Sequence, residues 1–398
     1  MQTFNNFYFH FFDPQFRLIA ALVFAVAFNM YATPVIVRIA KAKKLFDVPD
    51  ERHNHSTAVP TLGGLGIYAT IVTVGMVFIN TCGLNGGGVS SSLTSLPPIM
   101  AGFTLIFFIG MKDDLLNISP WKKLTVEILA LFILIVIGDI RLCNLQGFLS
   151  IGELSYPLSI MLSLFAGIVI INSMNLIDGV DGLAASIVML SAIVFGSYFL
   201  ACNEWEYAIL AFIILGAIIP FYLYNVYGGK NKIFMGDSGS LILGFAMTIL
   251  VFRFNEMNTS SWAPVHFASG PAFSFAVLII PMFDTLRVFA IRIFRGVSPF
   301  KADRRHIHHL LLELGFNHLQ TTRILLLVNI AFIAFAYFFN SLGNTVLLIV
   351  MIVFAISLSS LAMWFRHRTY SLNFHQKEKP KHRTNWVHKF EFNFFELF

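Results

Sequence analysis

The sequence has few charged side chains. Of its 398 residues only 12% are Asp, Glu, Lys or Arg, whereas 57% are hydrophobic, and the mean hydropathy is +0.74. A soluble domain carries about 25% charged residues, because its surface must be hydrated. The composition therefore excludes a water-soluble domain and indicates an integral membrane protein.

The sequence also lacks features that would point to other classes of protein. Its three cysteines, Cys82, Cys143 and Cys202, form no Cys-x-x-Cys pair, which argues against a disulfide framework and against a cysteine-based zinc site. No short apolar segment with a small-residue cleavage site opens the chain, so we expect the first long apolar run to direct insertion into the membrane. The net charge of +6 is explained by cytoplasmic loops, so we expect membrane lipid and no nucleic acid as a partner.

Long apolar runs recur along the chain. A helix needs about 20 apolar residues to cross a bilayer core, and somewhat fewer if its ends are polar. The sequence contains eleven such runs, at 16–40, 62–80, 97–111, 121–139, 157–175, 183–201, 205–225, 238–255, 270–294, 321–340 and 344–365. This pattern predicts an all-α polytopic membrane protein. The loop at 140–156 alternates apolar and polar residues around two glycines, which favours a short β-hairpin.

Lysine and arginine are concentrated in alternate loops. The loop after the first run holds Lys41, Lys43 and Lys44, whereas the loop after the second run has no basic residue. The positive-inside rule therefore predicts an external N-terminus and a cytoplasmic C-terminus. We expect a membrane domain over 1–366 and a basic, aromatic cytoplasmic tail over 367–398. We interpret the tail as an interfacial anchor, with a disordered tail as the alternative.

Five aspartates lie at the ends of apolar runs. Asp178 and Asp181 sit in the Gly-containing turn between two runs, Asp113 and Asp114 follow the third run, and Asp237 opens the eighth. Charge beside an apolar segment is costly, so such residues more often serve chemistry than the fold. A solvated helix end is the alternative for Asp113 and Asp114, and an N-cap is the alternative for Asp237.

These carboxylates are all predicted to lie on the cytoplasmic face, where they would repel one another. A hard divalent cation relieves the repulsion, because Mg²⁺ binds carboxylate and amide oxygens and shares its coordination shell with phosphates. We therefore expect Mg²⁺ as the cofactor, with Mn²⁺ as the alternative.

A histidine motif follows the ninth run. His306, His308 and His309 stand next to Arg304 and Arg305, and this patch of donors suits phosphate oxygens. A zinc site and a solvated basic loop are the alternatives.

Three further residues carry weaker signals. Gly63 and Gly64 allow either close helix packing or a close approach of the backbone to a ligand. Phe234 precedes the Met-Gly-Asp turn and could stack on a base, although interfacial phenylalanines are common in membrane proteins.

Together these motifs resemble the polyprenyl-phosphate N-acetylhexosamine-1-phosphate transferases. The resemblance covers about residues 40–320 and rests on motifs in the family's order: Asp113-Asp114, Asn175–Gly182, Met235–Gly239 and His306–His309, with Pro60–Gly64 as a further element. The histidine motif is similar to the WecA-like branch rather than to the MraY translocase. No lysine stands shortly before Pro60, where the MraY translocase has one.

The resemblance implies an enzyme of the bacterial cytoplasmic membrane with its active site facing the cytoplasm. The enzyme would transfer N-acetylglucosamine 1-phosphate, or a related hexosamine 1-phosphate, from a UDP-N-acetylhexosamine to undecaprenyl phosphate and release UMP. This reaction initiates synthesis of a cell-envelope polysaccharide. An MraY-type phospho-N-acetylmuramoyl-pentapeptide transferase is the alternative within the family.

The resemblance also implies roles for individual residues. Asp237 and Asn175 would bind Mg²⁺, while Asp178 and Asp181 would shape the pocket for the nucleotide and pyrophosphate. Phe234 would stack on uracil, and Asn225 would bond the edge of that base. Asp113 and Asp114 would face the lipid phosphate. The three imidazoles of the histidine motif would bind phosphate oxygens: His306, His308 and His309.

A secondary transporter is the alternative from a different class, because transporters also carry acids within their apolar helices. The sequence shows no internal repeat, and a Gly-bracketed Asp turn suits a phosphate better than a transported ion. A homodimer is left open.

Overall fold

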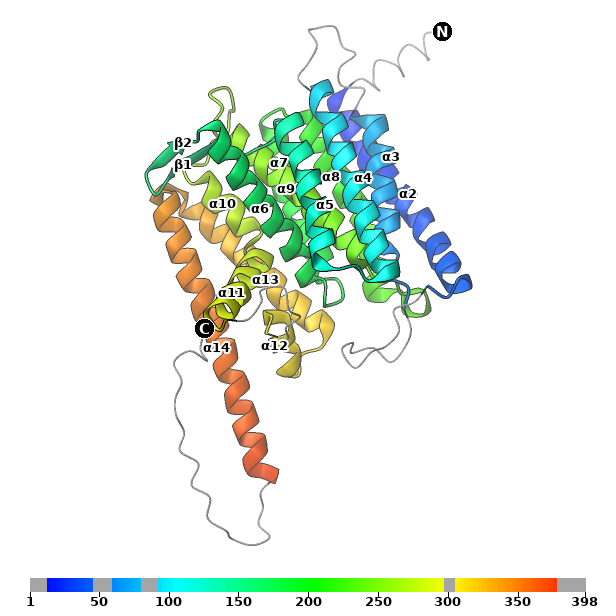
Figure 1. The fold of residues 1–398 in the computed structure, drawn as a ribbon, viewed down its shortest axis with the longest axis vertical. Helices are drawn as coiled ribbons and strands as arrows, with labels where there is room; N and C mark the ends of the chain where they lie inside the picture. Colours follow the sequence, from blue (N-terminus) through cyan, green and yellow to red (C-terminus); the bar gives the residue numbers. More distant parts are fainter. Residues whose placement is uncertain (1–12, 46–58, 80–91, 297–304, 378–398) are drawn as a thin grey trace.

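The computed structural model describes residues 13–45, 59–79, 92–296 and 305–377, and Figure 1 shows them as a bundle of helices with one small hairpin. Arg304 and the tail beyond Lys377 lie outside these residues, so the predictions for them stay predictions. The helices are α2 (Pro14–Ala42), α3 (Gly63–Phe78), α4 (Ser92–Leu116), α5 (Pro120–Phe132), α6 (Tyr156–Ile177), α7 (Leu183–Ala201), α8 (Trp205–Tyr227), α9 (Gly236–Met257), α10 (Gly270–Val277), α11 (Ile279–Phe294), α12 (Ile307–Glu313), α13 (His318–Phe338) and α14 (Asn344–Lys377).

Each predicted apolar run overlaps one of these helices, except that the run at 270–294 corresponds to α10 and α11, and the run at 121–139 to α5 and the π-helix η2 (Ile133–Ile137) that follows it. Within the described residues, seven helices are long and apolar enough to cross a membrane, and the bent pair would make eight. A polytopic, mostly helical membrane protein is thereby confirmed. The number of eleven crossings and the orientation stay predictions, because α3 is shorter than a full span.

Helix α9 is the centre of the bundle. Its residues from Ser238 to Phe252 are all buried, and α3, α4, α6 and α7 pack around it. Gly244 permits the close contact with α6, since a Cβ atom there would lie 2.6 Å from the Cα of Ile171. The site motifs at the start of α9 are therefore mounted on the most enclosed element of the fold.

Helices α10 and α11 meet at an angle of 87°. A sharp bend leaves backbone groups without partners inside the helix, and in apolar surroundings each such group is costly. Asn329 of α13, which is fully buried, satisfies two of them: its Nδ2 donates to the carbonyl of Val277 at 3.0 Å, and its Oδ1 accepts from the N–H of Ile280 at 3.5 Å. One amide side chain thus supports both sides of the bend.

The predicted β-hairpin is confirmed. Strands β1 (Asn144–Phe148) and β2 (Ile151–Glu153) pair antiparallel at the upper end of the bundle in Figure 1. Gln146 ties the hairpin to α9, because its Nε2 donates to the carbonyl of Asn255 at 3.0 Å and its Oε1 accepts from Asn258 Nδ2 at 2.7 Å.

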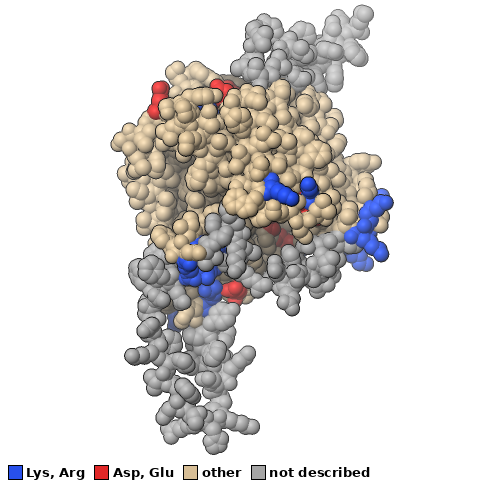
Figure 2. Space-filling view, in the orientation of Figure 1, with Lys and Arg blue, Asp and Glu red and all other residues tan. Residues whose placement is uncertain are grey.

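Helix α14 continues through Lys377, so the boundary expected between 366 and 367 falls within this helix, which extends beyond the bundle in Figure 1. On the face shown in Figure 2, most lysine and arginine side chains gather toward the lower part, below a broad surface with few charges. A broad uncharged surface is what a membrane-embedded protein presents to lipid tails.

The close contact at Gly244 gives the first prediction. Gly244→Ala should separate α9 from α6 and destabilise the protein by about 1–3 kcal/mol, because the obstructing atoms belong to backbone and cannot rotate away. The midpoint of thermal unfolding in detergent measures the loss. Gly152→Ala is the control, since no atom lies within 4 Å of a Cβ at that position. An unchanged midpoint for Gly244→Ala would contradict the packing described here.

Candidate functional site

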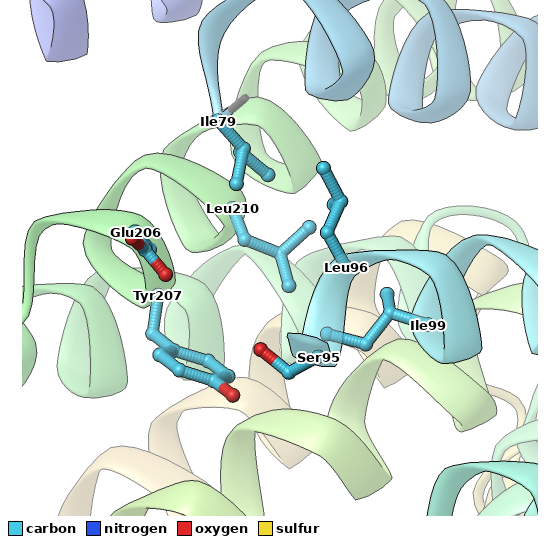
Figure 3. Close-up of a pocket in the computed structure, with 7 residues that line it drawn as sticks. All are labelled: Ile79, Ser95, Leu96, Ile99, Glu206, Tyr207 and Leu210. Atoms are coloured by element: carbon cyan, nitrogen blue, oxygen red, sulfur yellow. The ribbon is translucent and has the colours of Figure 1, made fainter. Parts of the chain in front are cut away.

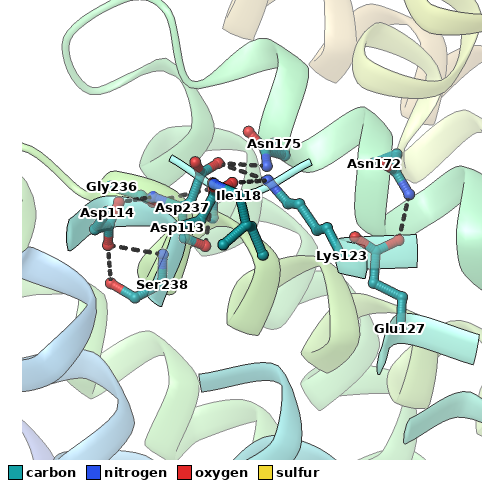
Figure 4. A network of polar contacts seen from close by, with 11 residues as sticks. Asp113, Asp114, Ile118, Lys123, Glu127, Asn172, Asn175, Gly236, Asp237 and Ser238 are labelled. Atoms are coloured by element: carbon teal, nitrogen blue, oxygen red, sulfur yellow. Dashed lines mark hydrogen bonds and ion pairs between the residues drawn. The ribbon is translucent and has the colours of Figure 1, made fainter. Parts of the chain in front are cut away.

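The predicted acidic motifs converge at one end of the bundle. Helices α4, α6 and α8 end there, whereas α5 and α9 begin there, so residues far apart in the chain become neighbours (Figure 4). The histidine motif, His306–His309, lies at the same end, at the start of the short helix α12.

Asp237 is the centre of this cluster. Its Oδ1 accepts from Lys123 Nζ at 2.9 Å and from Asn175 Nδ2 at 2.6 Å, as Figure 4 shows. Lys123 also contacts Oδ2 of Asp113 at 3.2 Å, and Oδ1 of Asp113 accepts from the N–H of Ile118 at 2.8 Å. One ammonium group therefore bridges two carboxylates that would otherwise repel each other.

Lys123 was not among the residues predicted for the site. Together with Lys122 it is one of the basic residues at the loop between the third and fourth apolar runs, which the charge pattern predicts to be cytoplasmic. The available signal was its position: a lysine just inside the start of an apolar run, ten residues after Asp113 and on the same predicted face of the membrane.

Asp114 supports the start of α9. Its carboxylate accepts from the N–H groups of Asp237 and Ser238, at 2.7 and 3.1 Å, and from the hydroxyl of Ser238 at 2.7 Å. These are the orphan donors of a helix N-terminus, which here are satisfied by a different helix. Gly236, at φ +72°, lets Asp114 approach, because a Cβ there would lie 2.7 Å from both carboxylate oxygens. In this structure Asp114 therefore fixes the backbone at the start of α9.

The acidic turn, Asp178–Gly182, is fixed by Asn225. The Oδ1 of Asn225 accepts from the N–H of Gly182 at 2.7 Å, and its Nδ2 donates to the carbonyl of Ile233 at 2.9 Å. Both amide atoms, for which the sequence suggested a bond to uracil, thus have protein partners here. The turn requires glycine at 182, where φ is +74° and a Cβ would lie 2.7 Å from Val226.

The two aspartates of the turn have opposite electrostatic environments. Burial raises the pKa of Asp178 well above its usual range, and the charge of Asp237 raises it further. Burial also raises the pKa of Asp181, but hydrogen bonds from His318 and Lys232 outweigh this effect and leave the pKa below its usual value. Asp181 is thus an ionised, paired group, whereas the surroundings of Asp178 disfavour its charged form.

Phe234 and the Pro60–Gly64 element lie against each other. The N–H of Phe234 donates to the carbonyl of Pro60 at 2.8 Å, and the N–H of Gly63 donates to the carbonyl of Phe234 at 2.9 Å. A Cβ on Gly64 would lie 2.2 Å from the backbone nitrogen of Gly239. Of the two interpretations of the glycine pair, the structure supports close packing. The ring of Phe234 lies under Lys232, whose Nζ is 5.1 Å from the ring centroid.

The histidine motif reaches the acidic turn. His308 lies over Gly179, where a Cβ would be 2.9 Å from Nε2 of the imidazole. His306 and His308 are buried and His309 is half-buried, while Arg305 is exposed. Burial and the charge of His309 lower the pKa of His308 to about 3, so this imidazole is neutral at pH 7. It can bind a phosphate as a hydrogen-bond donor but not as a cation.

The two residues expected to bind a divalent cation lie side by side. Carboxylate and amide oxygens are the ligands that Mg²⁺ takes, but in this structure the amide nitrogen of Asn175 and the ammonium group of Lys123 both donate to Oδ1 of Asp237. Within the described part of the chain no three His, Cys, Asp or Glu side chains form a metal-binding group.

A separate small pocket lies at the opposite end of the bundle (Figure 3). Its lining is mostly apolar and comes from the end of α3 and the starts of α4 and α8: Ile79, Ser95, Leu96, Ile99, Glu206, Tyr207 and Leu210. None of the predicted site residues contributes to it, so it is not part of the candidate site.

Comparison with known proteins shows the family of this chain. The sequence profile described as "Glycosyl transferase family 4" matches residues 96–255, which include every acidic and amide residue of the site. The undecaprenyl-phosphate alpha-N-acetylglucosaminyl 1-phosphate transferase of Salmonella typhimurium (strain LT2) is 30% identical over 307 residues, which cover 76% of this chain and 78% of the relative. The chain belongs to the polyprenyl-phosphate hexosamine-1-phosphate transferase family.

Other members of this transferase family show similar likeness. The enzyme of the same name from Escherichia coli (strain K12) is 29% identical over 306 residues, or 76% of this chain and 77% of the relative. The probable undecaprenyl-phosphate N-acetylglucosaminyl 1-phosphate transferase of Bacillus subtilis (strain 168) is 27% identical over 321 residues, or 79% and 83%. The histidine motif of this transferase lies outside the residues matched by the family profile.

The contacts of Asp114 give a second prediction. Asp114→Ala should lower the free energy of unfolding by roughly 3–5 kcal/mol: three hydrogen bonds to a charged group are lost, each contributing about 1.5–3 kcal/mol, while removal of a buried charge offsets part of that sum. Asp113→Ala leaves the start of α9 intact and should cost less. Chemical or thermal unfolding in detergent measures both variants. Equal losses would contradict the role assigned to Asp114.

The environment of His308 gives a third prediction. Its pKa in the folded protein, about 3, lies below the unfolded value of about 6.5, so the unfolded state binds more protons between these pH values. This residue should therefore make the wild-type protein less stable as the pH falls below 6.5. The carboxylate of Asp284 opposes the shift, and the imidazoles of His309, His306 and His318 add to it.

Thermal unfolding at pH 7.5 and pH 5 tests the prediction. His308→Gln should show a smaller difference between the two midpoints than the wild type. His367→Gln, on the exposed surface of α14, is the control and should keep the wild-type difference. The assignment is wrong if His308→Gln also keeps it.

Proposed function

We propose that this transferase moves N-acetylglucosamine 1-phosphate from UDP-N-acetylglucosamine to undecaprenyl phosphate and releases UMP. The observation that carries the proposal is the cluster around Asp237, where an amide and an ammonium group meet one carboxylate beside the acidic turn. The names of the relatives support undecaprenyl phosphate as the acceptor and N-acetylglucosamine 1-phosphate as the transferred group. Such a site can hold two phosphate-bearing substrates together.

The proposal includes a membrane arrangement. The chain would cross the bacterial cytoplasmic membrane eleven times, with an external N-terminus and the site facing the cytoplasm. The alternating distribution of lysine and arginine supports this orientation. It would place the site on the side where nucleotide sugars are made available.

The cofactor in this proposal is Mg²⁺, held by Asp237 and Asn175, with Mn²⁺ as a substitute. When bound, the metal would supply positive charge to the pyrophosphate of the donor. The protein's own contribution is to keep the two ligands adjacent: Asp114 fixes the backbone that carries Asp237, and the end of α6 carries Asn175.

The reaction in the proposal is a direct displacement. A phosphate monoester has a second pKa near about 6, so the acceptor is largely ionised at pH 7 and needs little general-base assistance. An oxygen of the lipid phosphate attacks the phosphorus that bears the sugar, a new P–O bond forms, and the bond to UMP breaks. Lys123 lowers the repulsion between the two anions, the histidine motif donates hydrogen bonds to phosphate oxygens, and Asp113 positions the acceptor or removes a residual proton.

Two alternatives are less well supported. An MraY-type transferase would be expected to have a lysine shortly before Pro60, and this chain has none. A secondary transporter would place its acids near the middle of the membrane, whereas these acids lie at helix ends on one side of the bundle. Double displacement through an aspartyl-phosphate is the remaining alternative for the mechanism.

Release of UMP by the purified protein tests the function. With UDP-N-acetylglucosamine, undecaprenyl phosphate and Mg²⁺ we expect steady UMP production, and with EDTA we expect almost none. Asp237→Ala should lower the rate at least about 100-fold while the protein stays monodisperse, because it removes a metal ligand. Asp139→Ala, at an exposed residue away from the site, is the control.

Each alternative predicts a different result in this assay. A transporter would release no UMP under any condition. A stoichiometric burst of UMP without the lipid, with radiolabel retained on the protein, would replace direct attack by double displacement. Substantial Mg²⁺-dependent activity in Asp237→Ala would remove this residue from the metal site.

A further inference from the structure

A second buried acidic group lies outside the cluster around Asp237. Asp284 is on α11 and is only 4% exposed. Its Oδ2 accepts from Nδ1 of His306 at 2.9 Å, and its Oδ1 accepts from Arg287 at 2.9 Å. The N–H of Ile307 lies within hydrogen-bond distance of both oxygens, at 3.1 and 3.2 Å. All partners of this carboxylate therefore belong to α11 or to the start of α12.

Asp284 provides hydrogen-bond acceptors for the start of α12. Helix α12 has only seven residues, and the side chain of its N-cap residue, His306, makes no capping hydrogen bond. A helix this short is unstable on its own and needs outside partners for its first N–H groups. Asp284 is such a partner, from another helix. Arg287 strengthens the attachment, because it also donates to the carbonyl of Arg305 at 2.6 Å.

The contact with Asp284 also fixes which ring nitrogen of His306 carries a hydrogen. A carboxylate only accepts hydrogen bonds, so Nδ1 of His306 must carry the hydrogen that points to Asp284. This arrangement leaves Nε2 as the nitrogen that can face a ligand, and it fixes the orientation of the ring. The ring of His308 lies nearly parallel to that of His306, at 11° and 5.6 Å, and reaches the acidic turn at Gly179.

We infer that Asp284, with Arg287, is a positioning residue for the transfer reaction: it fixes the ring of His306 and the start of α12, and so holds His308 at the acidic turn. The inference rests on the proposed function, because it assigns the histidine motif to the same site. The outer contact of α12, between Glu313 and Arg366 at 3.2 Å, is about one-third exposed on both sides and contributes little.

A double-mutant cycle tests the inference. Asp284→Asn should lower kcat about 10–100-fold, the usual effect of losing a group that orients a functional histidine. KM for UDP-N-acetylglucosamine should change less than kcat. The double variant Asp284→Asn/His306→Ala should have a kcat no more than about 3-fold below that of His306→Ala alone, since both changes remove the same interaction between Asp284 and His306. Glu313→Gln, the same chemical change on the exposed side of α12, should keep wild-type rates.

A second measurement does not depend on activity. Modification of His306 by diethyl pyrocarbonate, followed by mass spectrometry, should be at least about 5-fold faster in Asp284→Asn than in the wild type, because the ring is no longer held in a buried position. Glu313→Gln should leave the rate unchanged.

The outcomes separate the inference from the proposed function. If the wild type releases no UMP, the proposed function fails, and an unchanged modification rate in Asp284→Asn would then also overturn the positioning of His306. If the wild type is active, either of two results overturns the inference. One is an unchanged kcat in Asp284→Asn, and the other is a double variant whose fold-loss in kcat is the product of the two single fold-losses. Should Asp284→Asn not yield a monodisperse protein, Arg287→Lys decides: it keeps the charge but loses the forked geometry, and full activity would overturn the inference.

Discussion

The structure depends on neutralising carboxylates where apolar helices end. Asp113 and Asp237 come from helices far apart in sequence, and the ammonium group of Lys123 lies between them. Without a cation in this position the two negative charges would repel each other at the edge of an apolar interior. The convergence of α4, α5 and α9 at one point is therefore an electrostatic requirement as well as a result of packing.

Backbone contacts make this charged centre rigid. Asp114 holds the first N–H groups of α9, and glycines at 64 and 236 allow backbone and carboxylate to approach at distances that any side chain would prevent. Such contacts have no rotamers to exchange, so they fix the position of Asp237 more tightly than side-chain packing would. The histidine motif is attached differently, through polar contacts with the Asp284 carboxylate.

Much of the fold could be predicted from the sequence. The run predicted at 183–201 has the bounds of α7, and the hairpin near Gly147 was also found, because long apolar runs and turn glycines are local signals. The convergence of the acidic motifs followed from the charge of the loops. Lys123, Asp284 and Asn329 could not be assigned roles, because the partner of each lies on another helix and the sequence does not show which helices meet.

The bend between α10 and α11 depends on a third helix, α13. The carbonyl of Val277 and the N–H of Ile280 are both bonded to one fully buried amide, that of Asn329. In the bent chain both groups have a partner in Asn329; unpaired in apolar surroundings, each would cost several kcal/mol. The bend is therefore stabilised from α13, so a helix that contributes no carboxylate to the site helps to set the direction of α11, which carries Asp284.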